Sequence, residues 1–166
     1  NGNSKGGGGS KRFDGSDNEE QKKRIGLVAE MIVFEKLKTL FENVKWVSNY
    51  ANLIYKTHPG YNPEGKDGLG YDIEYLDADA NKHFVEVKGR SDYYDAFEIT
   101  KTEIDKALQS KESYKIILVT HTLDNSKRRI RDLGNIFNLE NGEDFFSNNK
   151  FTPIYKNFEI RFKEIN

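Results

Sequence analysis

Cysteine is absent from this sequence of 166 residues, which excludes disulfide bonds, thiolate zinc sites and a cysteine nucleophile. A strong charge of one sign is also lacking, because 26 basic and 27 acidic side chains leave a net charge of -1. The whole molecule therefore has no net attraction to nucleic acid or anionic membrane, and any nucleic-acid contact must use a local patch. Neither a signal peptide nor an apolar run of about 18 residues occurs, so we expect a soluble, cytoplasmic protein without membrane contact.

The remaining composition fits one modest domain. Hydrophobic residues make up 36% of the chain and charged residues 32%, which suits a single core under a polar surface. Residues 1–18 show no apolar periodicity and contain five glycines by Gly9, which predicts a flexible linker or tail. The string Gly-Gly-Gly-Gly-Ser is also used as an engineered linker, so the fold prediction does not depend on it. We expect one folded domain over residues 19–166.

Two stretches predict helices. Apolar residues at spacings of three and four predict a long amphipathic helix that begins at Asp17 or Asn18 and continues to Phe41. Thr100, with Glu103 three positions later, forms a capping box that opens a second helix, which ends near residue 110.

Apolar runs rich in β-branched residues predict the strands. They cover Val44–Ser48, Tyr71–Leu76, His83–Lys88, a short stretch at Phe97–Ile99, Tyr114–Thr120 and an edge strand at Phe158–Phe162. The run at 114–120 is almost wholly apolar, as expected for a strand covered on both faces. Residues 49–69, rich in Pro and Gly, are predicted to form a long loop. The order α-β-β-β-α-β predicts an α/β fold with a central mixed sheet flanked by helices.

The run Val-Glu-Val-Lys at residues 85–88 carries the best clue to function. Side chains alternate along a strand, so the valines point to one face while Glu86 and Lys88 point to the other. Asp72 lies before a turn-rich stretch at residues 77–81, so a hairpin could bring its carboxylate beside Glu86. Two carboxylates and an ammonium at one place suggest Mg²⁺ and an anion. Taken alone, the Glu-Val-Lys pattern supports only an exposed strand face with mixed charges.

Asp72 followed at hairpin distance by Glu86-Val87-Lys88 resembles the signature of the PD-(D/E)XK nuclease superfamily, with Tyr71 where the superfamily name has proline. A wider set of strings is similar to one branch, the NO VEIN C-terminal-like domain of bacterial restriction and phage-defence proteins. They are Ile25-Gly-Leu-Val-Ala-Glu30, Trp46-Val-Ser48, Gly70-Tyr-Asp-Ile73, Val85-Glu-Val-Lys-Gly89, Phe97-Glu-Ile-Thr100 and Glu103, which span about residues 20–122. The resemblance implies a restriction-endonuclease-like core and a Mg²⁺-dependent DNA endonuclease, in which Mn²⁺ could substitute.

The resemblance also implies roles for particular residues. Asp72 and Glu86 would hold the metal, and Lys88 would stabilise the attacked phosphate or position the water. Glu30 would be a further metal ligand, although on helix pattern alone it is a boundary glutamate paired with a basic side chain. Glu103 would be an accessory residue facing the site, but its capping box accounts for it as well.

Other residues are weaker candidates. Lys127, Arg128, Arg129 and Arg131 form the densest basic cluster and could contact DNA phosphates, although a solvated loop explains them equally well. The three histidines, His58, His83 and His121, show no metal-ligand spacing. Among Tyr93, Tyr94 and Phe97, packing is the expected use, with base contact as the alternative.

Three functional classes stay open. The first is a metal-dependent endonuclease acting on double-stranded DNA and joined to a partner or fused ATPase or helicase module. The second is a nuclease-like fold without catalysis that binds DNA or docks a protein. The third is a metal-free interaction domain with a solvated charged face. A homodimer would suit cleavage of both strands, but no residue demonstrates one.

Overall fold

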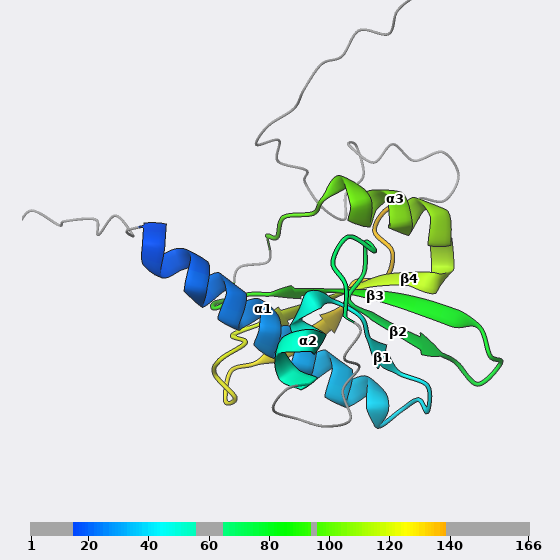
Figure 1. Cartoon of the computed structure of the whole chain (residues 1–166), viewed down its shortest axis with the longest axis horizontal. Helices are drawn as coiled ribbons and strands as arrows, with labels where there is room; N and C mark the ends of the chain where they lie inside the picture. The colour runs from blue at the N-terminus through cyan, green and yellow to red at the C-terminus, as the bar shows by residue number, and fades with distance from the viewer. Residues whose placement is uncertain (1–14, 56–64, 94–95, 139–166) are drawn as a thin grey trace, which may run out of the picture.

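A mixed five-stranded sheet lies between one long helix on one face and a shorter helix on the other (Figure 1). The computed structural model describes residues 15–55, 65–93 and 96–138. Along the chain the elements are α1 Gly15–Lys38, β1 Lys45–Trp46, α2 Asn49–Tyr55, β2 Ile73–Leu76, β3 Lys82–Gly89, α3 Lys101–Ser110, the 3₁₀ turn η1 Lys111–Ser113, β4 Tyr114–Thr120 and β5 Arg129–Asp132. The predicted α/β class is confirmed, and the architecture is consistent with a restriction-endonuclease-like fold.

Strand β3 is the centre of the sheet. The spatial order is β1-β2-β3-β4-β5, with β3 antiparallel to β2 and parallel to β4. Ile73 pairs with Val85, and Glu86 pairs with Ile116. A parallel pair needs a crossover connection, which α3 supplies between β3 and β4. The outer strands β1 and β5 pair antiparallel with their neighbours.

The alternation along β3 separates two hydrophobic clusters, one on each face of the sheet. Val85 and Val87 pack under α1 with Ala29 and Val33, all of them buried. Phe84, on the opposite face, packs with the cluster that α3 covers. Glu86 and Lys88 share the face of Phe84, so the predicted separation of valines from charges is confirmed.

A close approach of α1 to the end of β3 fixes where the helix lies. A Cβ atom at Gly89 would lie 2.9 Å from the Cβ of Ala29 and 3.0 Å from the carbonyl oxygen of Ile25. A larger residue than glycine would therefore force the helix outward. Because Glu30 follows Ala29, this contact also sets the distance of Glu30 from the sheet.

The predicted loop at residues 49–69 is wrong in its first part, where α2 forms a short helix. Ala51 is fully buried in the cluster under α1, and Ile54 packs against that cluster. The first turn is held by Asp67, whose Oδ1 accepts a hydrogen bond from the backbone N–H of Asn49 at 2.9 Å. This cap comes from a residue 18 positions away, so the local pattern could not reveal it.

Two strand predictions also need correction. No strand forms at 97–99 in the described part of the chain, because Phe97 and Ile99 pack against the cluster under α3. The polar stretch with the basic residues instead contains β5, in which Ile130 packs towards the α1 side while Arg129 and Arg131 are exposed. Charged side chains on an edge strand limit pairing with other chains. The predicted strand at 158–162 lies outside the described residues.

The remaining boundaries differ little from the prediction. Helix α1 begins two residues earlier than expected and ends at Lys38, before the predicted end at Phe41. The capping box at Thr100 opens α3 as predicted, and β4 is covered on both faces. No helix within the described ranges has the length and apolar character needed to cross a membrane.

Candidate functional site

The hairpin of β2 and β3 brings Asp72 beside Glu86. Asp77 shapes the turn, because its Oδ1 accepts hydrogen bonds from the backbone N–H groups of Asp79 and Asn81 at 3.0 and 2.8 Å. Asp72 lies just before β2, and its own N–H donates to the carbonyl of Val85 at 2.9 Å. The predicted approach of the two carboxylates agrees with the strand register, in which Ile73 pairs with Val85, and with the pKa of Glu86, which burial and the charge of Asp72 raise.

The carboxylate of Asp72 is part of the sheet's hydrogen-bond pattern. Its Oδ2 accepts from the backbone N–H of Val87 at 2.8 Å, the residue between Glu86 and Lys88. The carbonyl oxygen of Asp72 accepts from the N–H groups of Val47 and Ser48 at 2.7 and 3.2 Å. Asp72 is therefore fixed through both its backbone and one of its carboxylate oxygens.

Lys88 lies between two carboxylates on the α3 side of the sheet. Its Nζ is 2.7 Å from Oε1 of Glu86 and 2.8 Å from Oε2 of Glu103. Glu86 is only 5% exposed, so the interpretation of Glu86 and Lys88 as a solvated strand face is wrong. Helix α3 covers this face and removes most of the solvent from the ion pairs.

Glu103 combines the two roles that the sequence left as alternatives. Its backbone N–H donates to Oγ1 of Thr100 at 3.3 Å, and its Oε2 accepts from the N–H of Thr100 at 3.0 Å, which completes the capping box. The same Oε2 accepts from Lys88. The start of α3 is thereby tied to the candidate catalytic lysine.

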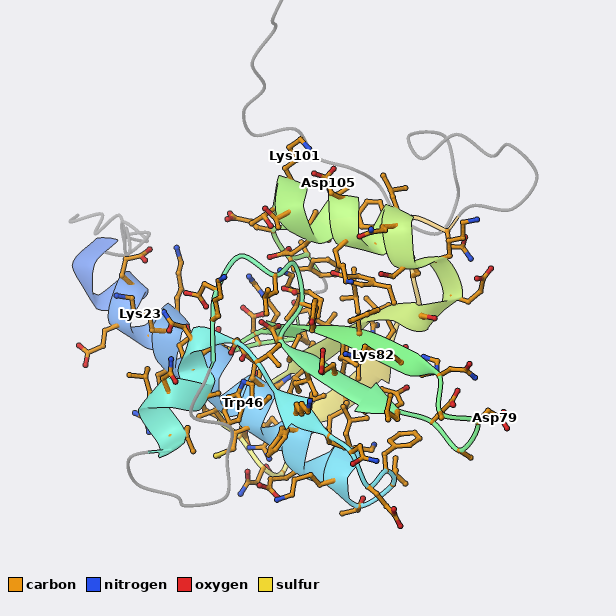
Figure 2. The ribbon with its side chains drawn as sticks, turned by 45° about the vertical axis from the view of Figure 1, so that its right-hand side comes forward. Lys23, Trp46, Asp79, Lys82, Lys101 and Asp105 are labelled. Atoms are coloured by element: carbon orange, nitrogen blue, oxygen red, sulfur yellow. The ribbon has the colours of Figure 1, made fainter. Side chains whose placement is uncertain are left out.

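Glu30 reaches the site from α1 and is 5% exposed. Its Oε2 accepts a hydrogen bond from Nε1 of Trp46 at 2.7 Å and another from Oγ of Ser48. Trp46 lies inside the molecule beside α1, with its ring centroid 5.6 Å from that of Phe34 (Figure 2). A boundary glutamate paired with Lys or Arg is therefore wrong, because the partners of Glu30 are an indole and a hydroxyl.

Burial and mutual repulsion raise the pKa values of three carboxyl groups. Burial raises the pKa of Glu30 to about 8, against the hydrogen bonds from Ser48 and Trp46, which lower it. Burial and the negative charge of Glu30 raise the pKa of Asp72 well above its usual value. Burial and the negative charge of Asp72 do the same to the pKa of Glu86, although Lys88 opposes the shift.

The negative charges of the site also raise the pKa values of Lys88 and Tyr50. Burial alone would lower the pKa of Lys88, but Glu86 and Glu103 raise it above its ordinary value. Burial raises the pKa of Tyr50 of α2, and the negative charge of the nearby Glu30 raises it further. The sequence interpretation assigned no role to Tyr50, because α2 itself was not predicted.

Carboxylate oxygens are the donors that Mg²⁺ takes. Among the described residues, Lys88 pairs with Glu86 and Glu103 and its charge acts on Asp72, while Glu30 interacts electrostatically with Asp72. The chemistry of the donor set therefore fits a hard divalent cation. No group of three or more acidic, histidine or cysteine side chains in the described ranges is placed so that it could hold a metal ion. Binding of a cation would therefore require a rearrangement of the site, beginning with the contact between Glu86 and Lys88.

The four basic candidates do not act as one patch. Arg128 holds its own turn, because its Nε and Nη2 donate to the carbonyl of Thr122 at 2.9 and 2.6 Å. Lys127 lies 3.6 Å from a carboxylate oxygen of Asp124. Arg129 and Arg131 are exposed and lie two positions apart on β5.

The aromatic and histidine candidates also differ in whether they are packed or exposed. Phe97 packs against the cluster under α3, as expected, whereas Tyr93 is 79% exposed. His83 has a structural role, with Nε2 2.8 Å from Oδ2 of Asp77 and its ring stacked on Tyr75. His58 and Tyr94 lie outside the described residues.

The family model described as Protein NO VEIN, C-terminal, matches residues 29–133, which is more than half of the chain. The matched range contains all five charged residues of the candidate site, which are Glu30, Asp72, Glu86, Lys88 and Glu103. No curated protein matches the chain, and no solved structure matches it.

Proposed function

The chain belongs to the NO VEIN C-terminal family, and from this premise we propose that it is a Mg²⁺-dependent DNA endonuclease domain of the PD-(D/E)XK type. Membership of the family suggests a nuclease-like defence domain. The finer proposal adds the metal, the reaction and a restriction or phage-defence system as the setting.

One observation carries this proposal: the carboxyl groups of Glu30, Asp72 and Glu86 interact electrostatically in a largely buried site, where Lys88 pairs with Glu86 and Glu103. Buried carboxylates without compensating cations are costly, and the raised pKa values of Glu30, Asp72 and Glu86 express that cost. A cluster serving stability alone would be better built with fewer acids or more bases. Strongly perturbed groups gathered at one place favour a functional role.

Each residue of the candidate site would have its own role in the reaction. Asp72 and Glu86 would hold Mg²⁺, with Glu30 assisting, and Mn²⁺ could replace it. When bound, the ion would supply Lewis acidity at the phosphate and lower the pKa of water. Lys88, held by Glu86 and Glu103, would offset the charge that develops on the attacked phosphate. Glu103 would keep the ammonium directed, because the same carboxylate oxygen is fixed by the start of α3.

Efficient delivery of the DNA would need a module outside this domain, so the domain alone should cleave only weakly. With a net charge of -1, the chain neutralises few phosphates, and nonspecific affinity for double-stranded DNA should be low. We therefore propose that a partner or fused ATPase or helicase module brings the substrate, and that a homodimer would serve cleavage of both strands. The exposed Arg129 and Arg131 are the basic candidates best placed for phosphate contact.

Cleavage of supercoiled plasmid with Mg²⁺ or Mn²⁺ tests the proposal. The wild type should nick the plasmid, and Asp72→Ala, Glu86→Ala and Lys88→Ala should each lose activity. Two controls match these changes in charge. Asp79→Ala alters the exposed turn of the same hairpin, and Lys101→Ala alters a lysine on the outer side of α3 (Figure 2). Both controls should cleave like the wild type.

The alternative is a nuclease-like fold that binds DNA or docks a protein without cleaving. Calorimetric titration with Mg²⁺ on the same samples distinguishes this alternative from the proposed endonuclease. Metal binding that Asp72→Ala and Glu86→Ala abolish supports the proposal even when cleavage awaits a partner module. Absence of both cleavage and Mg²⁺ heat at millimolar concentration would favour the alternative.

A further inference from the structure

Residues 46–48, here called the positioning segment, contact two acidic residues of the site that come from different elements. Trp46 and Ser48 donate hydrogen bonds from their side chains to Glu30 of α1. Val47 and Ser48 donate from their backbone N–H groups to the carbonyl of Asp72. One short stretch of chain therefore sets the position of the α1 carboxylate relative to the residue that begins β2.

The positioning segment is itself firmly held. Trp46 is fully buried and Ser48 is 5% exposed, so neither side chain is free to turn towards solvent. The carbonyl of Ser48 accepts from the N–H of Ala51 at 3.0 Å, which ties the segment to α2. Trp46 also donates to Oγ of Ser48 at 2.9 Å, which joins the two donors to Glu30 in one network.

The two carboxylate oxygens of Glu30 differ in their hydrogen bonds. Both donors bind Oε2, whereas no hydrogen bond from the described residues reaches Oε1. The network therefore fixes the carboxylate through one oxygen and leaves the other for a different ligand. The negative charge of Glu86 acts on Glu30, that of Glu30 acts on Asp72 and that of Asp72 acts on Glu86, so these three carboxylates are linked electrostatically.

We propose that Trp46 and Ser48 are positioning residues that hold Glu30 through Oε2, so that Oε1 is the oxygen Glu30 presents to a divalent cation. This inference rests on the proposed function, because it needs a cation shared with Asp72 and Glu86. Partners that orient a metal ligand typically change metal affinity by about 10- to 100-fold when removed. A purely structural network would affect folding and leave the affinity for the cation unchanged.

The single tryptophan makes the network observable without activity. In the metal-free protein, the indole N–H resonance of Trp46 should move in Glu30→Ala and in Ser48→Ala, because both changes alter its hydrogen bonds. On addition of Mg²⁺ to the wild type, the same resonance should move again and saturate. An indole resonance that is identical in the wild type and in Glu30→Ala would overturn the inference.

Calorimetric titration with Mg²⁺ then tests the consequence for the cation. Ser48→Ala and Trp46→Phe should weaken the affinity at least tenfold, and Ser126→Ala, a matched change in an exposed turn, should leave it unchanged. Ser48→Ala removes only a hydroxyl group, so it still provides the test if the Trp46→Phe variant does not fold. Wild-type binding with undiminished affinity in Ser48→Ala would refute the positioning role alone. Absence of Mg²⁺ binding by the wild type would refute the proposed function, and the inference with it.

Discussion

Replacing Glu30 by glutamine should stabilise the metal-free protein, and increasingly so as the pH rises. Burial raises the pKa of Glu30 to about 8 in the folded protein, from an ordinary value of 4.5. An acid whose pKa is raised by folding leaves stability intact below its unfolded pKa. Stability is then lost as the pH rises towards the folded pKa. Glutamine removes this loss and still offers an oxygen to Trp46 and Ser48.

The magnitude follows from the size of the shift. Each pKa unit corresponds to about 1.4 kcal/mol, so ionisation of Glu30 should cost at most about 3 kcal/mol of unfolding free energy at pH 7. Above pH 8 the same reasoning gives at most about 5 kcal/mol. Well below pH 4.5 the wild type and Glu30→Gln should be nearly equal in stability, because Glu30 is then protonated in both the folded and the unfolded state.

Urea denaturation in buffers containing a chelator, followed by Trp46 fluorescence, measures these free energies. Glu35→Gln, an exposed change on the same helix, is the control and should follow the wild type at every pH. The difference between the wild type and Glu30→Gln should widen from pH 5 to pH 8.5. A difference that is constant with pH, or a variant less stable than the wild type at pH 8.5, would refute the account of Glu30.

Three further changes test how the site is built. Gly89→Ala should cost about 1–3 kcal/mol of unfolding free energy, because its Cβ would meet Ala29 at 2.9 Å; a urea midpoint equal to that of the wild type would contradict this. Thr100→Ala should cost about 1 kcal/mol by removing the cap of α3, measured by the same denaturation, with an unchanged free energy as the contrary result. Lys88→Met should cost about 3–5 kcal/mol at pH 8, because the buried Glu86 and the partly buried Glu103 lose their cation, and less at pH 5, because burial raises the pKa of Glu86. Equal losses at both pH values would show that the ion pairs are not the cause.

The sequence was informative where the relevant signal is local. Alternation along β3 was enough to place Glu86 and Lys88 on one face, and the capping box located the start of α3. The turn-rich stretch between β2 and β3 predicted the hairpin that brings Asp72 to Glu86. These features depend on neighbours within a few positions, which a sequence pattern records directly.

The rest depends on contacts between distant residues. Helix α2 is capped by Asp67 from 18 positions away, so the Pro- and Gly-rich composition around it indicated a loop. The partners of Glu30 are separated from it by 16 and 18 positions, and no periodicity on α1 points to them. The burial of Glu86 depends on where α3 packs. These are tertiary effects, which override the local preference of the chain.

The most direct test of the central claim is nicking of supercoiled plasmid by the wild type and by Glu86→Gln, in Mg²⁺ and in chelator, at matched protein concentration. The substitution keeps the size of the side chain and removes its negative charge. The account predicts nicking by the wild type in Mg²⁺ and none in chelator or by Glu86→Gln. Nicking by Glu86→Gln at the wild-type rate, or by the wild type without metal, would contradict a carboxylate-held metal site.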